Sequence, residues 1–224
     1  MSTRALLLAF LLLAAGALAG CAEEPPPEPQ ALVDQAADAL LFAEGFAFRV
    51  DREGDLRDIG GWLIRSASGE YEAPSDVYAD VKVALGGLIV QAAVASIEDR
   101  SWQQDPLSGE WSEIDPEDAI TVAGLFGADG LPAVLTLDFT NPEYVGRGEV
   151  DGLPGEPLHQ VAVDLDAARL SEISAGLIPP TVERADLWVS DEGEFRRVAV
   201  TDETGRWVID VFDYGPDHVV EPPV

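Results

Sequence analysis

The sequence predicts an α+β domain in which a long antiparallel meander carries helices grouped on one face. Three observations predict this fold class. Short β-prone runs follow one another with Gly, Asp or Pro between them, as in antiparallel sheets. Other segments repeat apolar residues with the period of a helix. One pair of runs is separated by two glycines alone, a pattern typical of a tight hairpin.

The first helix is predicted over residues 31–44, "ALVDQAADALLFAE", and Gly45 can end it. The apolar positions that share one face of this helix are Leu32, Val33, Ala36, Ala37, Leu40 and Leu41. The strands expected next cover residues 46–52, 60–66, 77–85 and 88–97, with a short one near Trp102.

Gly86-Gly87 is the predicted turn of the hairpin formed by 77–85 and 88–97. In that register Val83 faces Val90, and Val81 faces Ala92. One side of the hairpin then carries only small and medium apolar side chains: Val77, Ala79, Val81, Val83, Val90, Ala92 and Val94. The other side carries a mixed set suited to partial exposure: Tyr78, Asp80, Lys82, Ile89, Gln91 and Ala93. The small side chains leave space above the sheet, which either a ligand or an ordinary core of helices would fill.

A second helix is predicted over residues 114–126, because Asp115 suits the N-cap and Pro116 the first helical position. Residues 131–139 predict a further short helix. The remaining expected elements are strands at 144–150 and 158–164, a helix at 166–175, and strands at 185–190, 195–201 and 207–213. Residues 191–194 and 202–205 are predicted as the hairpin turns between the last three strands.

The N-terminus is typical of an export signal. Arg4 is its only charge, and an apolar run from Ala5 to Leu18 is too short for a transmembrane helix. Leu18-Ala19-Gly20-Cys21 resembles the bacterial lipobox, which implies cleavage before Cys21 and attachment of a diacylglyceryl group to its thiol. The alternative is an ordinary signal peptide with a chance cysteine near its cleavage site.

Three segments follow from this interpretation: a signal peptide at 1–20, a lipidated acidic and proline-rich stalk at 21–30, and one domain at 31–224. Cys21 is the only cysteine, so an internal disulfide is excluded. The formal charge of −29 excludes nucleic acid as a partner and disfavours anionic surfaces.

No motif in the chain indicates catalysis, a cofactor or a metal. The two histidines, His159 and His218, belong to no zinc-binding pattern. Acidic pairs such as Asp164/Asp166 or Glu192/Glu194 carry little weight in a chain with 42 acidic residues. The five tryptophans could stack on sugars, although core packing is the commoner use. We therefore expect no catalytic residue, no cofactor and no metal site.

Several motifs, in order along nearly the whole exported chain, resemble the LppX/LprG family of bacterial envelope lipoproteins. They are the lipobox and stalk, "DVKVALGG" (80–87), "EDRSWQ" (98–103), "EWSEIDPEDAI" (110–120), and the later "DGLPGEPLHQVAVDLDAARL" and "LWVSDEGEFRRVAV". Asp99 departs from the family, which often has Gly there, and so does the strong acidity.

This resemblance implies a curved, unclosed antiparallel half-barrel whose concave face is covered by helices that enclose an apolar cavity. The cavity residues it implies are the hairpin face named above together with Ile120, Leu125 and Phe126. The implied function is a non-enzymatic lipoprotein on the extracytoplasmic face of the cell membrane. It would bind and transfer multi-acylated lipids or glycolipids, with a membrane lipid exporter as a further partner. The alternatives are a structural or adhesive envelope module with a packed core, and an anchored hydrolase that uses paired carboxylates.

Overall fold

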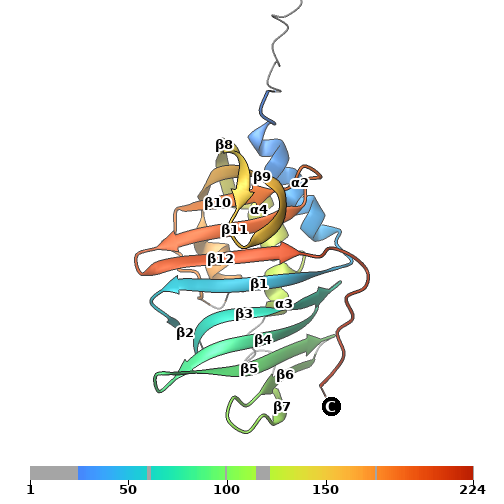
Figure 1. The fold of residues 1–224 in the computed structure, drawn as a ribbon, viewed down its shortest axis with the longest axis vertical. Coiled ribbons are helices and arrows are strands. Elements are labelled where there is room, and N and C mark those ends of the chain that lie inside the picture. Colours follow the sequence, from blue (N-terminus) through green and yellow to red (C-terminus); the bar gives the residue numbers. More distant parts are fainter. Residues whose placement is uncertain (1–24, 60–61, 99, 115–121, 175, 224) are drawn as a thin grey trace, which may run out of the picture.

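A computed structural model describes residues 25–59, 62–98, 100–114, 122–174 and 176–223. In these ranges twelve strands form one curved, open antiparallel sheet, with the helices on one of its faces (Figure 1). The helices are α2 (Pro29–Leu41), α3 (Val122–Phe126), α4 (Leu131–Leu137) and α5 (Ala167–Ile173). The strands are β1 (Gly45–Gly54), β2 (Arg57–Ile59), β3 (Trp62–Glu72), β4 (Asp76–Leu85), β5 (Leu88–Ile97), β6 (Arg100–Gln104), β7 (Trp111–Ile114), β8 (Phe139–Val150), β9 (Leu153–Leu165), β10 (Arg184–Val189), β11 (Phe195–Asp202) and β12 (Gly205–Phe212). The predicted fold class is confirmed.

The sheet consists of two meanders joined by its first strand. Its order is β7-β6-β5-β4-β3-β1-β12-β11-β10-β9-β8, and β2 pairs only with β3. Strand β1 pairs with β3 on one side and with β12 on the other, where Ala47 lies opposite Phe212. Strand β1, the first strand of the domain, therefore lies at the centre of the sheet and pairs with β12, the last strand.

The β4–β5 hairpin has the predicted register. Val81 lies opposite Ala92, Val83 opposite Val90, and Leu85 opposite Leu88 across the Gly86-Gly87 turn. Both glycines have positive φ, 57° and 87°, a conformation that costs a glycine little. The two-residue turn therefore determines which side chains of β4 and β5 face the helices.

The ends of several elements differ from the prediction. Helix α2 starts at Pro29, two residues early, because Glu28 accepts hydrogen bonds from the backbone N–H groups of Gln30 (2.9 Å) and Ala31 (3.3 Å). It ends at Leu41, before Gly45. The predicted helix at 131–139 is too long, since Phe139 already begins β8 and is buried there.

Two short strands, β2 and β7, were not predicted. The predicted helix start at Asp115 and Pro116 lies outside the described residues, while the later part of that segment is helical as α3. The last three strands and the turns between them agree with the prediction to within two residues.

The main core lies between the sheet and the helices. Helix α2 buries the predicted face: Leu32, Val33, Ala36, Ala37 and Leu40. It packs against α4 and against strands β8 to β11. The predicted sixth member, Leu41, is instead 45% exposed, because it is the last residue of the helix.

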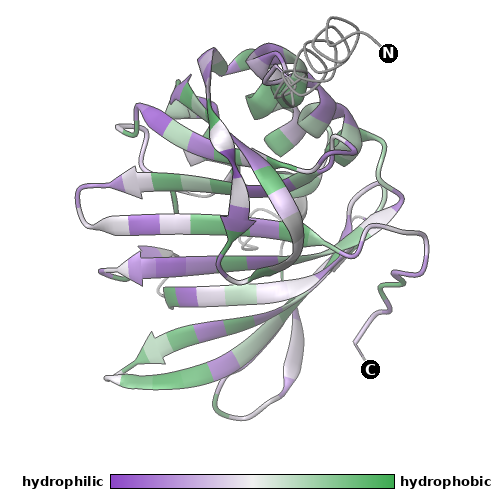
Figure 2. Cartoon of the chain, turned by 45° about the horizontal axis from the view of Figure 1, so that its top comes forward, coloured by the Kyte–Doolittle hydropathy of each residue, from purple (hydrophilic) through white to green (hydrophobic). Residues whose placement is uncertain are grey.

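A second, smaller core lies on the opposite, outer face of the sheet. The β8–β9 hairpin curls over this face (Figures 1 and 2). Its Leu158 packs with Trp188, Ala199 and Val208, and Val150 and Leu153 close the cluster. Arg49 of β1 donates a hydrogen bond to the carbonyl oxygen of Gly152 in the hairpin turn (3.1 Å). The outer face is therefore partly covered by the β8–β9 hairpin, and its remainder carries both polar and apolar side chains.

Candidate functional site

The apolar face of the β4–β5 hairpin forms a wall on the helix side of the sheet. The side chains of Val77, Ala79, Val81, Val83, Ala92 and Val94 are each at most 6% exposed, and Val90 is partly buried beside them. This wall contains no polar side chain before Ser96. A surface of Val and Ala side chains offers dispersion contacts without directional hydrogen bonds, which suits disordered hydrocarbon chains as well as it suits a core.

Helix α3 covers this wall. Leu125 and Phe126 are buried and belong to the same hydrophobic cluster as Val77, Ala79 and Val81. Among the elements that the structure describes, α3 packs against β4. Ile120, the remaining residue implied for the cavity, lies outside the described residues. The described residues of the predicted cavity are thus brought together, and their low exposure shows that α3 and its surroundings occupy the space above the wall.

An aromatic cluster, which the sequence analysis missed, adjoins this wall. Phe126 of α3 meets the rings of Phe46 (5.1 Å between centroids) and Phe48 (4.8 Å), both from β1. Phe46 also stacks on Tyr71 of β3 at 4.7 Å and contacts Tyr214 at 5.6 Å. The alternation in "GFAFRV" indicates that Phe46 and Phe48 share a face, but the contacts with α3 depend on tertiary structure.

The wall and the aromatic cluster hold helix α3 by different kinds of contact. The rings hold one another in defined geometries, so Phe46 and Phe48 anchor α3 on the centre of the sheet. The neighbouring wall holds α3 by smaller, non-directional contacts.

The tyrosines near this region are neutral structural groups. Burial, with a smaller contribution from Asp76, raises the pKa of Tyr71, whose hydroxyl donates to the carbonyl oxygen of Pro74 (2.8 Å). Burial also raises the pKa of Tyr214, and its hydroxyl donates to the carbonyl oxygen of Phe195 (2.8 Å). Both hydroxyls therefore remain protonated at physiological pH, and neither is placed to accept a proton.

Three of the four carboxylates in the acidic pairs singled out in the sequence have structural partners. Asp164 accepts a hydrogen bond from Asn141 (2.9 Å), and Asp166 caps α5 by accepting from the N–H of Ala168 (3.1 Å). Glu194 pairs with Arg196 at 3.2 Å. These contacts give each of the three carboxylates a structural role, so their positions do not require a catalytic one.

His159 and three of the tryptophans likewise have structural contacts. His159 contacts the hydroxyl of Tyr144 (3.1 Å) and the carboxylate of Asp191 (3.0 Å). Trp102, Trp188 and Trp207 are at most 9% exposed and offer no open platform for a sugar. Within the described ranges, no three His, Cys, Asp or Glu side chains converge in a way that could hold a metal ion.

Comparison with known proteins agrees with this architecture. The family model of the LppX_LprAFG lipoproteins matches residues 28–219, which is most of the chain. The chain belongs to the LppX_LprAFG lipoprotein family. No curated protein sequence matches it.

Solved structures share its fold at low sequence identity. LprF from Mycobacterium bovis superposes with a TM-score of 0.68 at 18% identity, over 90% of this chain and 99% of LprF. The lipoprotein LppX from Mycobacterium tuberculosis gives a TM-score of 0.60 at 16% identity, over 87% of this chain and 99% of LppX. The family predicted from the sequence motifs is therefore confirmed, and so is the curved, open sheet. Of the helices in the described ranges, none is long and apolar enough to cross a bilayer.

Proposed function

We propose that this lipoprotein holds the acyl chains of a lipid between the β4–β5 wall and helix α3, and carries that lipid within the cell envelope. The observation that carries the proposal is the wall itself. Val77, Ala79, Val81 and Val83 form an unbroken apolar strip of small side chains beneath a short helix. Membership of a lipoprotein family supports the same function.

The physical task of such a carrier is to replace the hydrocarbon environment of the bilayer. Moving an acyl chain from the bilayer into water costs about 0.8 kcal/mol of free energy for each CH₂ group. A long chain therefore leaves the membrane only if an apolar protein surface receives it. The Val and Ala wall supplies this surface. Leu125 would move from the wall onto the bound chain and stay buried in both states, while the ring contacts of Phe126 keep α3 on β1. Selectivity then depends on the length and number of acyl chains that fit, and multi-acylated lipids or glycolipids are the class we assign.

The proposed anchor keeps this cavity near its lipid supply. Cys21, in the segment outside the described residues, would carry the lipid group that fastens the protein to the extracytoplasmic face of the cell membrane. The proline-rich residues that follow it act as a stalk, and their glutamates disfavour contact with an anionic surface. A membrane lipid exporter is the partner that would supply or receive the lipid.

Replacing Val81 with Trp should abolish lipid binding with little loss of stability. The indole side chain would take the place of the acyl chain on the wall. Native mass spectrometry of protein purified in mild detergent should show lipid adducts on the wild type and none on Val81→Trp. Gln91→Trp is the matched control, since Gln91 is exposed on the other face of the same hairpin and its variant should retain lipid.

A packed structural module gives the opposite result. Overpacking a full core costs about 1–3 kcal/mol, so Val81→Trp would then lower the free energy of unfolding by that amount. If the wild type also carries no lipid and takes up none when lipid is added, the carrier function is wrong.

Replacing Cys21 with Ser should release the protein from membranes. Serine cannot form the thioether, and without two or more acyl chains a protein of this charge has no stable attachment to a bilayer. Fractionation of cells that express each form should find the wild type in the membrane pellet and Cys21→Ser in the soluble fraction. Retention of the variant in the pellet would show that another segment provides the anchor.

A further inference from the structure

A cleft on the outer face of the sheet gathers the cations of this acidic protein. It has a volume of about 580 Å³ and lies over β1, β3, β4, β11 and β12, beside the turn of the β8–β9 hairpin. Its basic lining residues are Arg49, Arg52, Arg65, Lys82, Arg197 and Arg206. Its acidic lining residues are Asp51, Glu53 and Asp151. Arg52 is buried against Asp202, and Arg49 and Arg197 share the carboxylate of Asp210, so Arg65, Lys82 and Arg206 provide the positive charge that no carboxylate in the described ranges pairs.

The cleft differs from the rest of the surface in how many of its basic side chains lack an ion pair with a carboxylate. Nine of the twelve basic residues that the structure describes lie within 4.0 Å of a carboxylate. The remaining three have no such partner in the described ranges: Arg65, Lys82 and Arg206. All three line this cleft. With 42 acidic residues in the chain, a shortage of carboxylates does not explain this distribution.

A partly buried ion-pair network forms the floor of the cleft. The carboxylate of Asp210, only 1% exposed, accepts hydrogen bonds from Arg197 Nε (2.5 Å) and from Arg49 Nη2 (2.5 Å). Arg49 Nε lies 3.1 Å from Asp51 Oδ2, but it is not directed at that oxygen, and it remains a buried donor without an acceptor. A buried donor of this kind is costly unless another acceptor reaches it.

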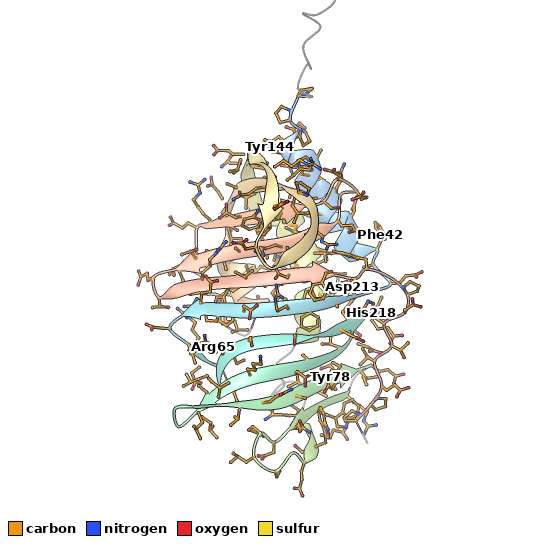
Figure 3. All side chains as sticks on the ribbon, in the orientation of Figure 1. Phe42, Arg65, Tyr78, Tyr144, Asp213 and His218 are labelled. Carbon is orange, nitrogen blue, oxygen red and sulfur yellow. The ribbon has the colours of Figure 1, made fainter. Side chains whose placement is uncertain are left out.

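The three unpaired cations approach the cleft from different strands. Lys82 is exposed on the outer side of β4, opposite Ser66 of β3, which also lines the cleft. Arg65 lies at the irregularity in the pairing of β3 with β4, and Figure 3 shows it at the end of β3 near β2. Arg206 lies over the ring of Trp188 at 6.0 Å. Groups from separate strands that converge on one space suit a compact ligand with several acceptor oxygens.

We propose that this cleft binds a phosphate-like oxyanion, either as free phosphate or as the phosphate of a lipid head group. Guanidinium groups donate two parallel hydrogen bonds to such an anion, and a lysine ammonium adds a point charge. The net negative charge of the protein does not prevent this, because salt screens exposed charges beyond about 10 Å at 0.1 M. The proposal does not depend on the apolar cavity, which lies on the opposite face.

Lys82 provides a direct probe, because it is the only lysine in the chain. Reductive methylation with ¹³C-formaldehyde places one dimethylamine signal at Lys82 and a second at the α-amino group, which serves as an internal reference. The full Cys21→Ser chain is used, so that the proposed lipid anchor plays no part. Titration with inorganic phosphate at constant ionic strength should shift the Lys82 signal along a saturable curve and leave the reference unchanged.

The double variant Arg65→Gln/Arg206→Gln should weaken phosphate binding about tenfold or more, because it removes two charge-assisted donors. Arg100→Gln is the control. Arg100 is exposed, pairs with Glu113 and does not line the cleft, so its loss should leave the dissociation constant unchanged. A linear, unsaturated shift, or equal affinity in the double variant and the wild type, would overturn the proposal.

Vesicles separate the two sources of the anion. Phosphatidylcholine vesicles with phosphatidylglycerol should displace phosphate from the Lys82 site if a lipid head group is the ligand. Because phosphatidylcholine also carries a phosphate, displacement by vesicles of phosphatidylcholine alone would equally identify a lipid head group as the ligand. Saturable phosphate binding without displacement by either vesicle assigns the cleft to a free anion. Val81→Trp should bind phosphate normally in all arms, so a failure of the lipid carrier and a failure of the anion site give different results.

Discussion

Replacing Phe46 with Ala should lower the free energy of unfolding by about 3–5 kcal/mol. Phe46 is fully buried and contacts three aromatic rings from three segments: Tyr71 of β3, Phe126 of α3, and Tyr214 after β12. Alanine would leave a cavity at the centre of the sheet and would remove the ring contacts that hold α3 in place. Equilibrium unfolding in urea, followed by tryptophan fluorescence, measures the change.

Phe42→Ala is the matched control for this prediction. Phe42 follows α2, is 76% exposed, and is labelled near the end of that helix in Figure 3. The same change in side-chain volume should alter the free energy of unfolding there by no more than about 0.5 kcal/mol. Equal losses at the two positions would mean that the aromatic cluster is not the centre of the stabilising core.

The β4–β5 hairpin is the part of the fold that can be predicted residue by residue. Gly86-Gly87 sets the register locally, and the period of two then assigns every side chain of the hairpin to a face. The central position of β1 cannot be predicted in this way. Its pairing of Ala47 with Phe212 joins segments that are distant in sequence, and no local pattern specifies such a pair. Strands β2 and β7 are too short to show a period.

The apolar wall is predictable for the same local reason, whereas its cover is not. The local pattern indicates that Val81 and Ala92 share an apolar face, whereas Leu125 and Phe126 are assigned to it only through the family resemblance. The cationic cleft cannot be predicted from local patterns, since Arg49 and Arg206 line one cleft only because β1 pairs with β12. The exposed position of Lys82, between buried Val81 and Val83, is the one local indication that this face differs from the core.

Replacing Asp202 with Asn should cost about 3–5 kcal/mol of folding free energy at neutral pH. Its carboxylate forms a buried, bidentate pair with Arg52, with distances of 2.9 Å and 3.0 Å to the two guanidinium nitrogens. The side chain of Arg52 is 0% exposed, so the variant would leave an uncompensated charge inside the protein. The same carboxylate accepts from the N–H groups of Thr204 (2.7 Å) and Gly205 (2.9 Å) and so closes the β11–β12 turn.

The pH dependence of this loss provides an independent test. Burial alone would raise the pKa of Asp202, but the hydrogen bonds that Arg52 and Thr204 donate outweigh it and hold this pKa far below its ordinary range. A carboxyl group with a depressed pKa in the folded state stabilises the protein above its unfolded pKa of about 3.9, and this stabilisation is lost as the pH falls. The difference in unfolding free energy between the wild type and Asp202→Asn should therefore be constant from pH 7 to pH 5. Below pH 4 it should shrink by about 1.4 kcal/mol for each pH unit.

Urea unfolding of both proteins between pH 7 and pH 3 measures this difference directly. The comparison also cancels the response of the many other carboxylates in the chain, which titrate alike in the two proteins. Glu113→Gln is the control, because Glu113 pairs with Arg100 on the exposed surface and the loss of such a pair changes stability little. A difference for Asp202→Asn that stays constant down to pH 3 would show that the pKa of Asp202 is not depressed. The Arg52–Asp202 pair would then stabilise the end of the sheet by packing and hydrogen bonding, and not by its charge.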